Sequence, residues 1–158
     1  MTQFVRLSRE NVAYAVALAK EMHGLSTFAV DGPEFDWDYT YNNMLSTVGR
    51  SDYYFMLALD DAYDYCGAVC GRVIPYYFSR ALQGIEEAWY VRDGTKDRAK
   101  IATALMHGFM GWCLDEMGAR MVQSGDIADI NSLGVDALYK RLGFERYGSA
   151  YKYTRIRQ

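Results

Sequence analysis

The stretch that most constrains the fold covers residues 85–117, where an apolar strand, a charged loop and a long amphipathic helix follow one another. The strand ends at Val91 and the helix begins near Arg98. The connecting loop carries cations at Arg92, Lys96, Arg98 and Lys100. Free N–H groups and the positive end of the helix dipole, together with these cations, favour a bound phosphate. The alternative is a solvated basic loop without a ligand.

Length and composition restrict the class of protein. The chain has 158 residues, 51% of them hydrophobic and 23% charged, which is typical of one soluble domain with its own core, so we take residues 1–158 as a single domain. A net charge of -3 argues against a nucleic-acid binder. The sequence has neither an apolar run near the roughly 20 residues of a membrane span nor a signal-peptide pattern. We therefore expect a cytoplasmic protein without a membrane partner.

The cysteines and histidines do not form a recognisable metal or disulfide pattern. Cys66, Cys70 and Cys113 are odd in number and lie inside apolar patterns, which argues against a disulfide framework or a zinc site. His23 and His107 are far apart in the sequence and lack metal-ligand spacing. We expect buried, reduced thiols and no metal.

Hydrophobic periodicity predicts an alternating order of strands and helices. The expected strands span residues 4–7, 53–59, 65–74, 85–91, 120–124, 144–147 and 151–155, and the expected helices span residues 8–24, a segment ending near residue 49, 98–117 and 131–141. Ser8 is the expected N-cap of the first helix. Gly67 and Gly71 indicate a twisted or bulged strand. This order predicts an α/β (α+β) domain with a mixed sheet flanked by helices.

Two segments resemble the GNAT superfamily of acyl-CoA-dependent N-acyltransferases. A late segment of that family reads Asn…Leu-Tyr-x-Lys-x-Gly-Phe, and this chain has Asn131 followed by Leu-Tyr-Lys-Arg-Leu-Gly-Phe at residues 138–144. The family loop Arg/Gln-x-x-Gly-x-Gly/Ala aligns with Asp97, Lys100 and Ala102, of which only Ala102 conforms. The order of elements is similar over nearly the whole chain. The resemblance implies a mostly antiparallel sheet in a single acyltransferase domain.

The resemblance also implies an activity, namely transfer of an acetyl group from acetyl-CoA to a primary amine by direct attack in a ternary complex. It implies that acetyl-CoA contacts the central strand, the basic loop with the helix after it, and the last helix. The implied cofactor-binding residues are Tyr90, Val91, Arg98, Lys100, Ile101, Ala102, Thr103 and Asn131. Val91 would contribute its backbone N–H to the acyl carbonyl, although its side chain fits a plain core role. Helix capping alone would explain Asn131.

For the chemistry, the resemblance implies Tyr139 as the acid that protonates the leaving thiolate. A phenol with a pKa of about 10 stays protonated at neutral pH and can still give its proton to a thiolate. The alternative for Tyr139 is packing of helix against sheet. Glu87 is the expected base for the amine, preferred narrowly over Glu86 on the other face of the strand. A solvated glutamate would explain either residue, and many relatives use no dedicated base.

The acceptor side of the family fold corresponds to residues 27–38, where Asp31, Glu34, Asp36 and Asp38 accompany Phe35 and Trp37. These residues would attract a cationic amine on a small molecule or a protein, or they would only supply negative charge to the second helix. A C-terminal strand at residues 151–155 would allow a homodimer or protect a sheet edge.

Two non-catalytic interpretations stay open. The first is a degenerate GNAT fold that binds a partner through surface aromatic residues at positions 53–55 and 76–78. The second is a regulator whose basic loop binds a nucleotide other than CoA.

Overall fold

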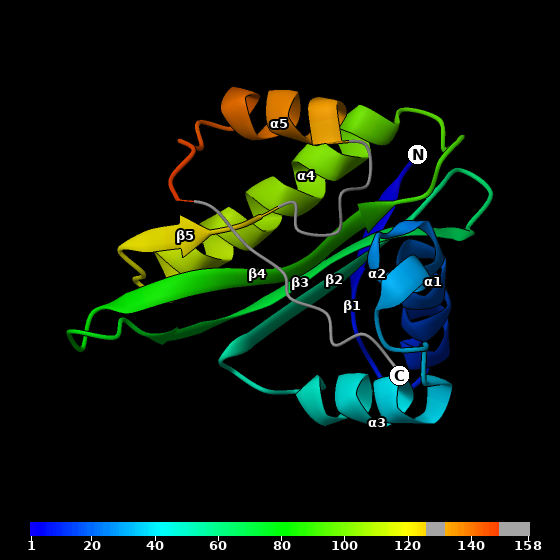
Figure 1. The fold of residues 1–158 in the computed structure, drawn as a ribbon, viewed down its shortest axis with the longest axis horizontal. Coiled ribbons are helices and arrows are strands. Elements are labelled where there is room, and N and C mark those ends of the chain that lie inside the picture. Colours follow the sequence, from blue (N-terminus) through cyan, green and yellow to red (C-terminus); the bar gives the residue numbers. More distant parts are fainter. Residues whose placement is uncertain (126–131, 149–158) are drawn as a thin grey trace.

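A computed structural model places residues 1–125 and 132–148, and these residues form one sheet with helices on both faces (Figure 1). The strands, in their order across the sheet, are β1 (Gln3–Arg6), β2 (Tyr53–Leu59), β3 (Tyr65–Pro75), β4 (Leu82–Val91) and β5 (Met121–Gln123). Strands β1 to β4 are antiparallel to their neighbours, and β5 is parallel to β4. This mixed, mostly antiparallel sheet confirms the predicted fold class.

The helices divide between the two faces of the sheet (Figure 1). They are α1 (Val12–Leu25), α2 (Phe28–Asp31), α3 (Trp37–Thr47), α4 (Arg98–Gly111) with its π-helical continuation η1 (Trp112–Glu116), and α5 (Ser132–Arg141). Helices α1 and α3 pack on one face, whereas α4 packs on the other. The helix predicted at 98–117 is therefore confirmed as α4 plus η1. The short α2 was not predicted. Among the placed residues, no helix is long and apolar enough to cross a membrane.

Two clusters of buried side chains, one on each face of the sheet, hold the fold together. The cluster under α4 contains Val69, Leu105 and Phe109, and the cluster under α1 contains Leu18 and Leu57, with each of these side chains at most 2% exposed. Burying one such side chain is worth roughly 1.5–3 kcal/mol.

The cysteines contribute to these two clusters as apolar side chains. Cys66, Cys70 and Cys113 are all buried, and none of them forms a disulfide. The prediction of buried, reduced thiols is therefore confirmed. Within residues 1–125 and 132–148, no group of histidine, cysteine or acidic side chains has the arrangement of a metal site.

A β-bulge interrupts the pairing of β3 with β4. Gly71 is opposite Glu86 and Cys70 is opposite Ala88, so Glu87 is the extra residue on β4. A Cβ atom on Gly71 would lie 2.2 Å from the Ile85 carbonyl oxygen, so the two backbones approach too closely for any side chain. The bulge predicted on β3 is found beside Gly67, where Cys66 is the extra residue between the pairs Ala58–Gly67 and Leu59–Tyr65. At Gly71 the bulged strand is β4 instead, and this bulge contains one of the two glutamates proposed from the sequence.

Two details of the prediction were wrong. Helix α1 begins at Val12 rather than after Ser8, because residues 8–11 form a separate turn in which the Asn11 side-chain oxygen accepts the N–H of Ser8 at 2.7 Å. Ser8 is therefore not the N-cap. The strand predicted at 144–147 is not formed, since residues 144–148 have no regular structure. The strand predicted at 151–155 lies outside the placed residues.

The β2–β3 turn contains a backbone conformation that should respond to mutation. Tyr63 is 67% exposed and adopts φ 66°, in the left-handed region that is unfavourable for a large side chain. We expect Tyr63→Gly to raise the free energy of unfolding by about 0.5–1 kcal/mol, because glycine relieves this strain at the cost of a more flexible unfolded chain. Urea unfolding measures the change. An unchanged or lower stability would contradict it.

Candidate active site

Among the placed residues, half of one edge of β4 lacks a partner strand. Strand β5 pairs with β4 only at residues 83–85, so residues 86–91 have no partner strand on that side within the placed part of the chain. Figure 1 shows β5 as a short arrow beside one half of the much longer β4. Apart from the Val91 carbonyl, which accepts a hydrogen bond from Arg98, the outward backbone groups of this half have no strand partner among the placed residues and can hydrogen-bond a ligand.

The hydrogen bonds around Val91 show which backbone groups point to this open edge. The backbone N–H of Arg92 donates to the Cys66 carbonyl on β3, so the backbone groups of Arg92 point inward to the neighbouring strand. The carbonyl of Val91 points the other way and accepts a hydrogen bond from Arg98 Nε at 2.9 Å. Because successive residues of a strand alternate in direction, the N–H groups of Val91 and Trp89 point to the open edge. Tyr90 instead directs its backbone toward β3, and its side chain is buried.

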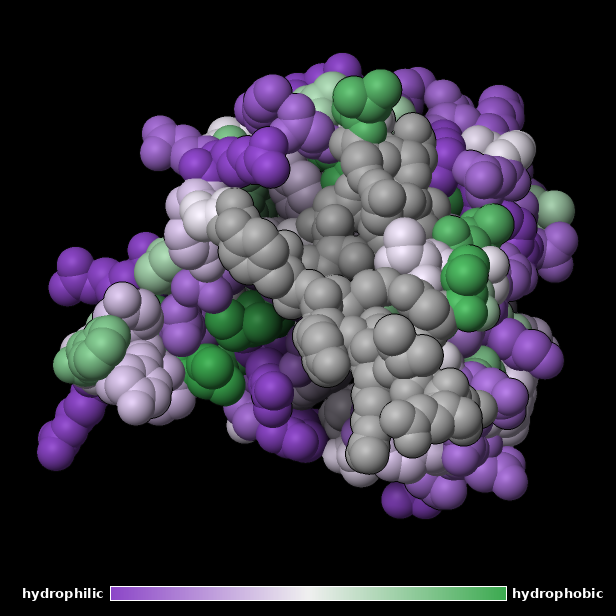
Figure 2. All heavy atoms as spheres, in the orientation of Figure 1, coloured by the Kyte–Doolittle hydropathy of each residue, from purple (hydrophilic) through white to green (hydrophobic). Residues whose placement is uncertain are grey.

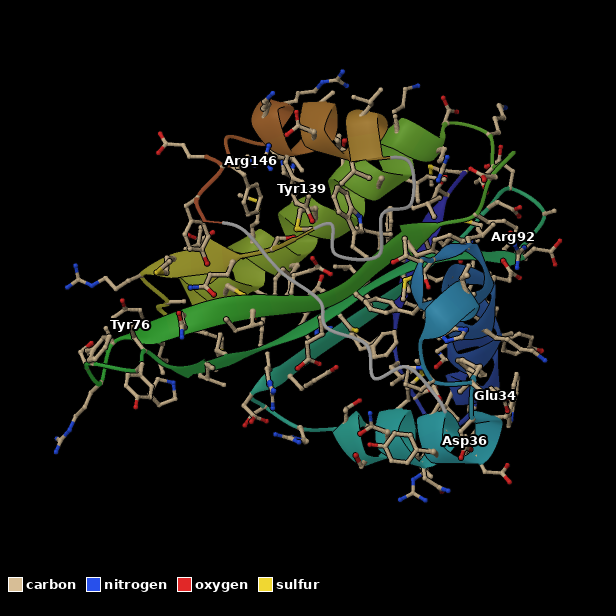
Figure 3. The ribbon with its side chains drawn as sticks, viewed as in Figure 1. Glu34, Asp36, Tyr76, Arg92, Tyr139 and Arg146 are labelled. Carbon is tan, nitrogen blue, oxygen red and sulfur yellow. The ribbon has the colours of Figure 1, made fainter. Side chains whose placement is uncertain are left out.

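Each cation of the basic loop is already paired with a carboxylate. The pairs are Arg92–Glu21 at 2.7 Å, Lys96–Asp61 at 3.7 Å, Arg98–Asp93 at 2.5 Å and Lys100–Asp97 at 3.0 Å. Figure 3 shows Arg92 directed toward α1, which carries Glu21. An anion at this loop must compete with these carboxylates. The lysine pairs are the easiest to displace, because exposed ion pairs contribute little free energy.

The start of α4 differs in detail from the alignment with the family loop. Asp97 is the N-cap in a left-handed conformation, with φ 56°. Its carbonyl accepts the N–H groups of Lys100 at 2.8 Å and Ile101 at 3.1 Å. The N–H of Ile101 is thus used inside the helix, and Ala102 and Thr103 follow further along it. Backbone contacts to a phosphate would have to come from residues before Lys100, earlier than the alignment predicts.

The structure brings Tyr139 into a compact polar cluster with Glu86 and Ser124. Ser124 Oγ lies 2.5 Å from Glu86 Oε2 and 2.5 Å from the Tyr139 hydroxyl, while the hydroxyl itself is 3.4 Å from Glu86 Oε2. The Tyr139 ring packs between Trp89 and Phe144, with ring centroids 5.3 and 5.2 Å away. Figure 3 shows this side chain extending from α5 toward the sheet. Tyr139 is therefore both packed and hydrogen-bonded beside the open half of β4.

The end of α5 explains part of the family-like segment at 138–144. Gly143 has φ 84°, its N–H donates to the Lys140 carbonyl, and the N–H of Phe144 donates to the Tyr139 carbonyl at 3.0 Å. These bonds form a Schellman motif, in which glycine ends the helix and the following apolar residue packs back onto it. Here Phe144 packs back onto Tyr139 itself. The Gly-Phe pair thus fixes the position of the tyrosine ring.

Glu86 is the carboxylate of this cluster, and its pKa is shifted far from the ordinary value. Burial raises the pKa of Glu86 from 4.5 to about 7, against the opposing effects of hydrogen bonds from Ser124, the Gly125 N–H and Tyr139. The negative charge of Glu87 adds a small further increase in this pKa. A carboxyl group with a pKa near 7 can both accept and give a proton at neutral pH.

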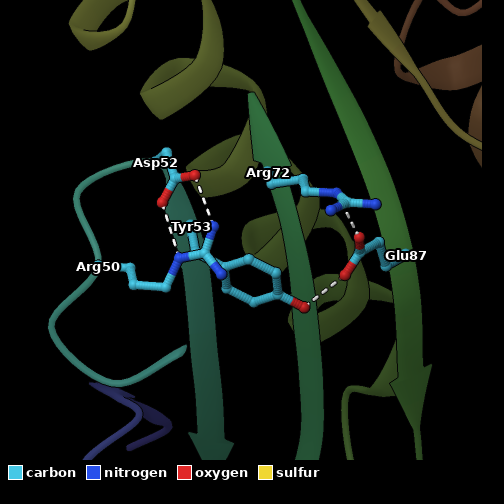
Figure 4. A network of polar contacts seen from close by, with 5 residues as sticks. All are labelled: Arg50, Asp52, Tyr53, Arg72 and Glu87. Carbon is cyan, nitrogen blue, oxygen red and sulfur yellow. Dashed lines mark hydrogen bonds and ion pairs between the residues drawn. The ribbon is translucent and has the colours of Figure 1, made fainter. Parts of the chain in front are cut away.

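Glu87 belongs to a different network on the other side of the bulge (Figure 4). Its carboxylate lies 2.8 Å from Arg72 Nε and accepts a hydrogen bond from the Tyr53 hydroxyl at 2.5 Å. Arg50, which pairs with Asp52 at 2.7 Å, extends this network toward the start of β2. The two glutamates do point to different sides of the sheet, as the sequence predicted. However, the structure places Glu86, and not Glu87, beside Tyr139.

Sequence reasoning gave no role to Ser124, which joins Glu86 to Tyr139. A lone serine at the end of a short strand has no spacing signal, since its partners are 38 and 15 residues away. Only the parallel pairing of β5 with β4 brings it to Glu86. Asn131, which the resemblance implied as a further contact, lies outside the placed residues.

The acidic segment before α3 has a clear local role. Asp36 is the N-cap of α3 and accepts the N–H of Tyr39 at 2.9 Å, which fits the prediction that this segment supplies negative charge to the helix. Figure 3 shows Glu34 and Asp36 close to the start of α3. His23 Nε2 bonds the Pro33 carbonyl oxygen at 3.0 Å and so ties the segment to α1. A role in attracting the acceptor stays a prediction.

The interaction-module hypothesis predicts two aromatic clusters on the surface, at residues 53–55 and 76–78, and the two differ in exposure. Tyr54 and Phe55 on β2 are buried in the core, so residues 53–55 do not form a surface patch. Tyr77 and Phe78 at the tip of the β3–β4 hairpin are 88% and 81% exposed. Figure 2 shows hydrophobic residues reaching the surface at this tip, while hydrophilic residues cover most of the periphery of this face.

The raised pKa of Glu86 has a consequence for stability. Because the folded-state pKa of about 7 lies above 4.5, stability from this group is fully present below pH 4.5 and is lost as the pH rises through 7. Glu86→Gln removes this loss. We therefore expect the difference in unfolding free energy between the variant and the wild type to grow by about 2 kcal/mol, in favour of the variant, from pH 5 to pH 8. Urea unfolding at both pH values measures it. A pH-independent difference would contradict the prediction.

Comparison with known proteins gives structural similarity only. No family model matches the sequence, and no curated protein matches it significantly. Two aminoglycoside 6'-N-acetyltransferases are similar in structure at 14% sequence identity. One is AAC(6')-Iy bound to a CoA bisubstrate analogue (TM-score 0.76, 99% of each chain covered). The other is AAC(6')-Ih from Acinetobacter baumannii (TM-score 0.73, 100% of each chain covered).

A possible acetyltransferase from Clostridium difficile 630 matches at 12% identity, with a TM-score of 0.71 and 99% of each chain covered. Such low identities establish the fold and leave the individual site residues as predictions. The match extends over the whole length of all these chains, so it is not limited to a shared piece of sheet. The chain therefore has the fold of the GNAT acetyltransferases.

Proposed function

We propose that this protein is an N-acetyltransferase that moves an acetyl group from acetyl-CoA to a primary amine by direct attack in a ternary complex. The observation that carries this proposal is the open half of β4 with the Tyr139 cluster beside it. In this proposal an extended pantetheine arm bonds to the outer edge of β4, and Tyr139, which lies beside that edge, contacts the thioester sulfur. The structural neighbours, which include an acetyltransferase bound to a CoA analogue, support the same chemistry.

The proposed roles follow from the geometry of the site. The Val91 N–H, on the open edge, donates to the acyl carbonyl and stabilises the negative charge that develops on it during attack. Tyr139 gives its proton to the departing thiolate. Glu86 takes the role of base that the sequence assigned narrowly to Glu87, because Glu86 is hydrogen-bonded to the Tyr139 cluster. Glu87, which pairs with Arg72, has a structural role on the acceptor side of the sheet in this proposal.

The basic loop fits a phosphate-bearing ligand if its lysines change partners. Lys100 is 83% exposed and its ion pair with Asp97 spans a single helical turn, so its ammonium can move to a phosphate at low cost. Lys96 is equally exposed. Arg98 is held in place by the Val91 carbonyl and Asp93 and would orient the loop. Ile101 and Ala102 are buried in the core, and the Thr103 hydroxyl donates to the Ala99 carbonyl, so these three residues are not part of the proposed phosphate contacts.

Calorimetric titration with acetyl-CoA, with CoA and ATP as comparison ligands, tests the proposal. We expect micromolar binding of acetyl-CoA and CoA, weaker binding of ATP, and at least about a tenfold loss of affinity in Lys100→Glu, because the variant replaces an attraction to phosphate by a repulsion. Lys20→Glu, the same charge change at an exposed position on α1, is the control and should bind as the wild type does. Binding of ATP alone would favour a nucleotide-binding regulator.

The acceptor is proposed to be a small molecule with a primary amine. Two of the structural neighbours are aminoglycoside 6'-N-acetyltransferases, and Glu34, Asp36 and Asp38 give the segment before α3 and its first turn a negative charge that suits a cationic acceptor. A thiol-release assay with a panel of amines, including an aminoglycoside and a lysine-containing peptide, identifies the class. A cytoplasmic location and a homodimer stay predictions.

A second candidate function is a non-catalytic interaction module. The exposed Tyr77 and Phe78 and the internal pairing of all the loop cations favour it. Failure of acetyl-CoA, CoA and ATP to bind would make it the leading interpretation.

A further inference from the structure

A cavity lies at the edge of the sheet where β1 ends. It has a volume of about 360 Å³ and is formed by the end of β1, the connection from α3 to β2, the start of β2 and the first residue of η1. It shares no residue with the open half of β4, the basic loop or the Tyr139 cluster. Its volume is within the range of ordinary small-molecule sites, so a small organic ligand can fit.

Part of the cavity wall is apolar. It consists of the side chains of Leu7, Val48, Phe55 and Trp112, of which Leu7, Phe55 and Trp112 are each at most 8% exposed. Trp112 begins the π-helical turn η1, in which its carbonyl accepts the N–H of Met117, five residues later, at 2.9 Å. Such turns are rare and frequently occur at functional sites. An aromatic or aliphatic group of a ligand can pack against this wall.

Arg6 supplies the cavity with a positive charge. Its guanidinium lies 4.1 Å from the centre of the Tyr54 ring, in a cation–π contact. Burial raises the pKa of the Tyr54 phenol, the charge of Arg6 opposes this increase, and the charge of Glu116 adds to it. Glu116 is thus a nearby negative charge, but no ion pair joins it to Arg6. Within residues 1–125 and 132–148, the Arg6 guanidinium has no carboxylate or hydrogen-bond partner.

The other cation of the cavity is already neutralised. Arg50 donates to the two carboxylate oxygens of Asp52 at 2.9 and 2.7 Å, as Figure 4 shows. The cavity therefore offers one free positive charge, which matches one carboxylate better than a doubly charged phosphate. The planar fork of N–H donors on a guanidinium also fits the two oxygens of a carboxylate.

We propose that this cavity binds a small organic molecule with one carboxylate and one apolar group, the carboxylate on Arg6 and the apolar group against Phe55 and Trp112. An inorganic anion would leave the apolar wall uncovered, and an uncharged apolar molecule would leave Arg6 without a partner. The site is independent of the proposed function. A protein that failed to bind acetyl-CoA would still have it.

Titration with phenylacetate, followed by heteronuclear NMR of the whole chain, tests the site. The Nε–H resonance of Arg6, assigned by its absence in Arg6→Met, reports on the guanidinium, and the indole N–H resonance of Trp112 reports on the apolar wall. We expect both to shift and to saturate with a Kd of about 1 mM, as a ligand of this size allows. Phenylacetamide lacks the charge and inorganic phosphate lacks the apolar group. Each should bind at least about tenfold more weakly.

Variants of Arg6 test the role of its charge. Arg6→Met keeps an apolar stem against Tyr54 and should weaken phenylacetate binding at least about tenfold, read from the Trp112 resonance. Arg6→Lys keeps the charge but not the planar fork, so its affinity should lie between those of Arg6→Met and the wild type. Arg9→Met, the same change at an exposed arginine outside the cavity, is the control and should bind as the wild type does.

Four results would each overturn the proposed ligand. The first is no shift of either resonance up to about 10 mM phenylacetate. Equal binding of phenylacetamide would show an apolar cavity in which Arg6 has no role, and equal binding of phosphate would show an anion site in which the apolar wall has none. An equal loss of affinity in Arg9→Met would assign the binding to net charge. The comparison ligands need only the wild type, so they decide the question even if Arg6→Met does not fold.

Discussion

Replacing Tyr139 by phenylalanine is expected to lower kcat about 100-fold while leaving the affinity for acetyl-CoA unchanged. Phenylalanine keeps the ring contacts with Trp89 and Phe144, so the end of α5 and the shape of the site are preserved. What it removes is the hydroxyl 2.5 Å from Ser124, which is the proposed donor to the thiolate. Steady-state kinetics of thiol release with the best amine of the panel, together with calorimetry, separates the two effects.

The matched control for this change is Tyr63→Phe, which removes a hydroxyl from an exposed turn outside the site. It should keep the wild-type rate. An unchanged kcat in Tyr139→Phe would show that water or the amine itself protonates the thiolate. A rise in KM alone would assign the hydroxyl to ground-state binding.

Gly71→Ala is expected to lower the free energy of unfolding by about 3 kcal/mol or more. The added Cβ would lie 2.2 Å from the Ile85 carbonyl oxygen and 2.7 Å from the Phe109 ring. Neither can move away easily, because the carbonyl belongs to the backbone of β4 and Phe109 is completely buried. For a domain whose total stability is roughly 5–15 kcal/mol, such a loss is severe. Urea unfolding followed by circular dichroism measures it.

Gly24→Ala provides the opposite control. Gly24 lies inside α1 with no heavy atom near the position of an added Cβ, so alanine should raise stability by about 0.5 kcal/mol through its higher helix propensity. Near-normal stability of Gly71→Ala would mean that β3 and β4 are further apart at the bulge than the structure places them.

The sequence predicted much of the fold because its periodic patterns are local. The apolar positions of α1 and α4 recur at helical spacing, and the turn at residues 60–64 separates two apolar runs that pair as β2 and β3. The failures were local as well. Ser8 has a side chain suited to an N-cap. However, the Asn11 side chain accepts the backbone N–H of Ser8, and the helix begins about one turn later, at Val12.

The site was harder to predict because its members meet only through tertiary structure. The choice between Glu86 and Glu87 depended on a bulge, and simple alternation along a strand does not say which glutamate faces α5. Ser124 had no signal at all. The pairing of Lys96 with Asp61, across more than 30 positions of sequence, was equally invisible, although it bears directly on how the loop would bind a phosphate.

The Schellman motif at the end of α5 changes what the family-like segment tells a reader of related sequences. Leucine, glycine and phenylalanine at residues 138–144 are explained by ending a helix and seating an aromatic ring, and these requirements belong to the fold. A protein that had lost its chemistry would keep them. Searches for active members should therefore weigh the tyrosine together with a hydroxyl after β5 and a carboxylate on β4, since that combination has no purpose in ending a helix.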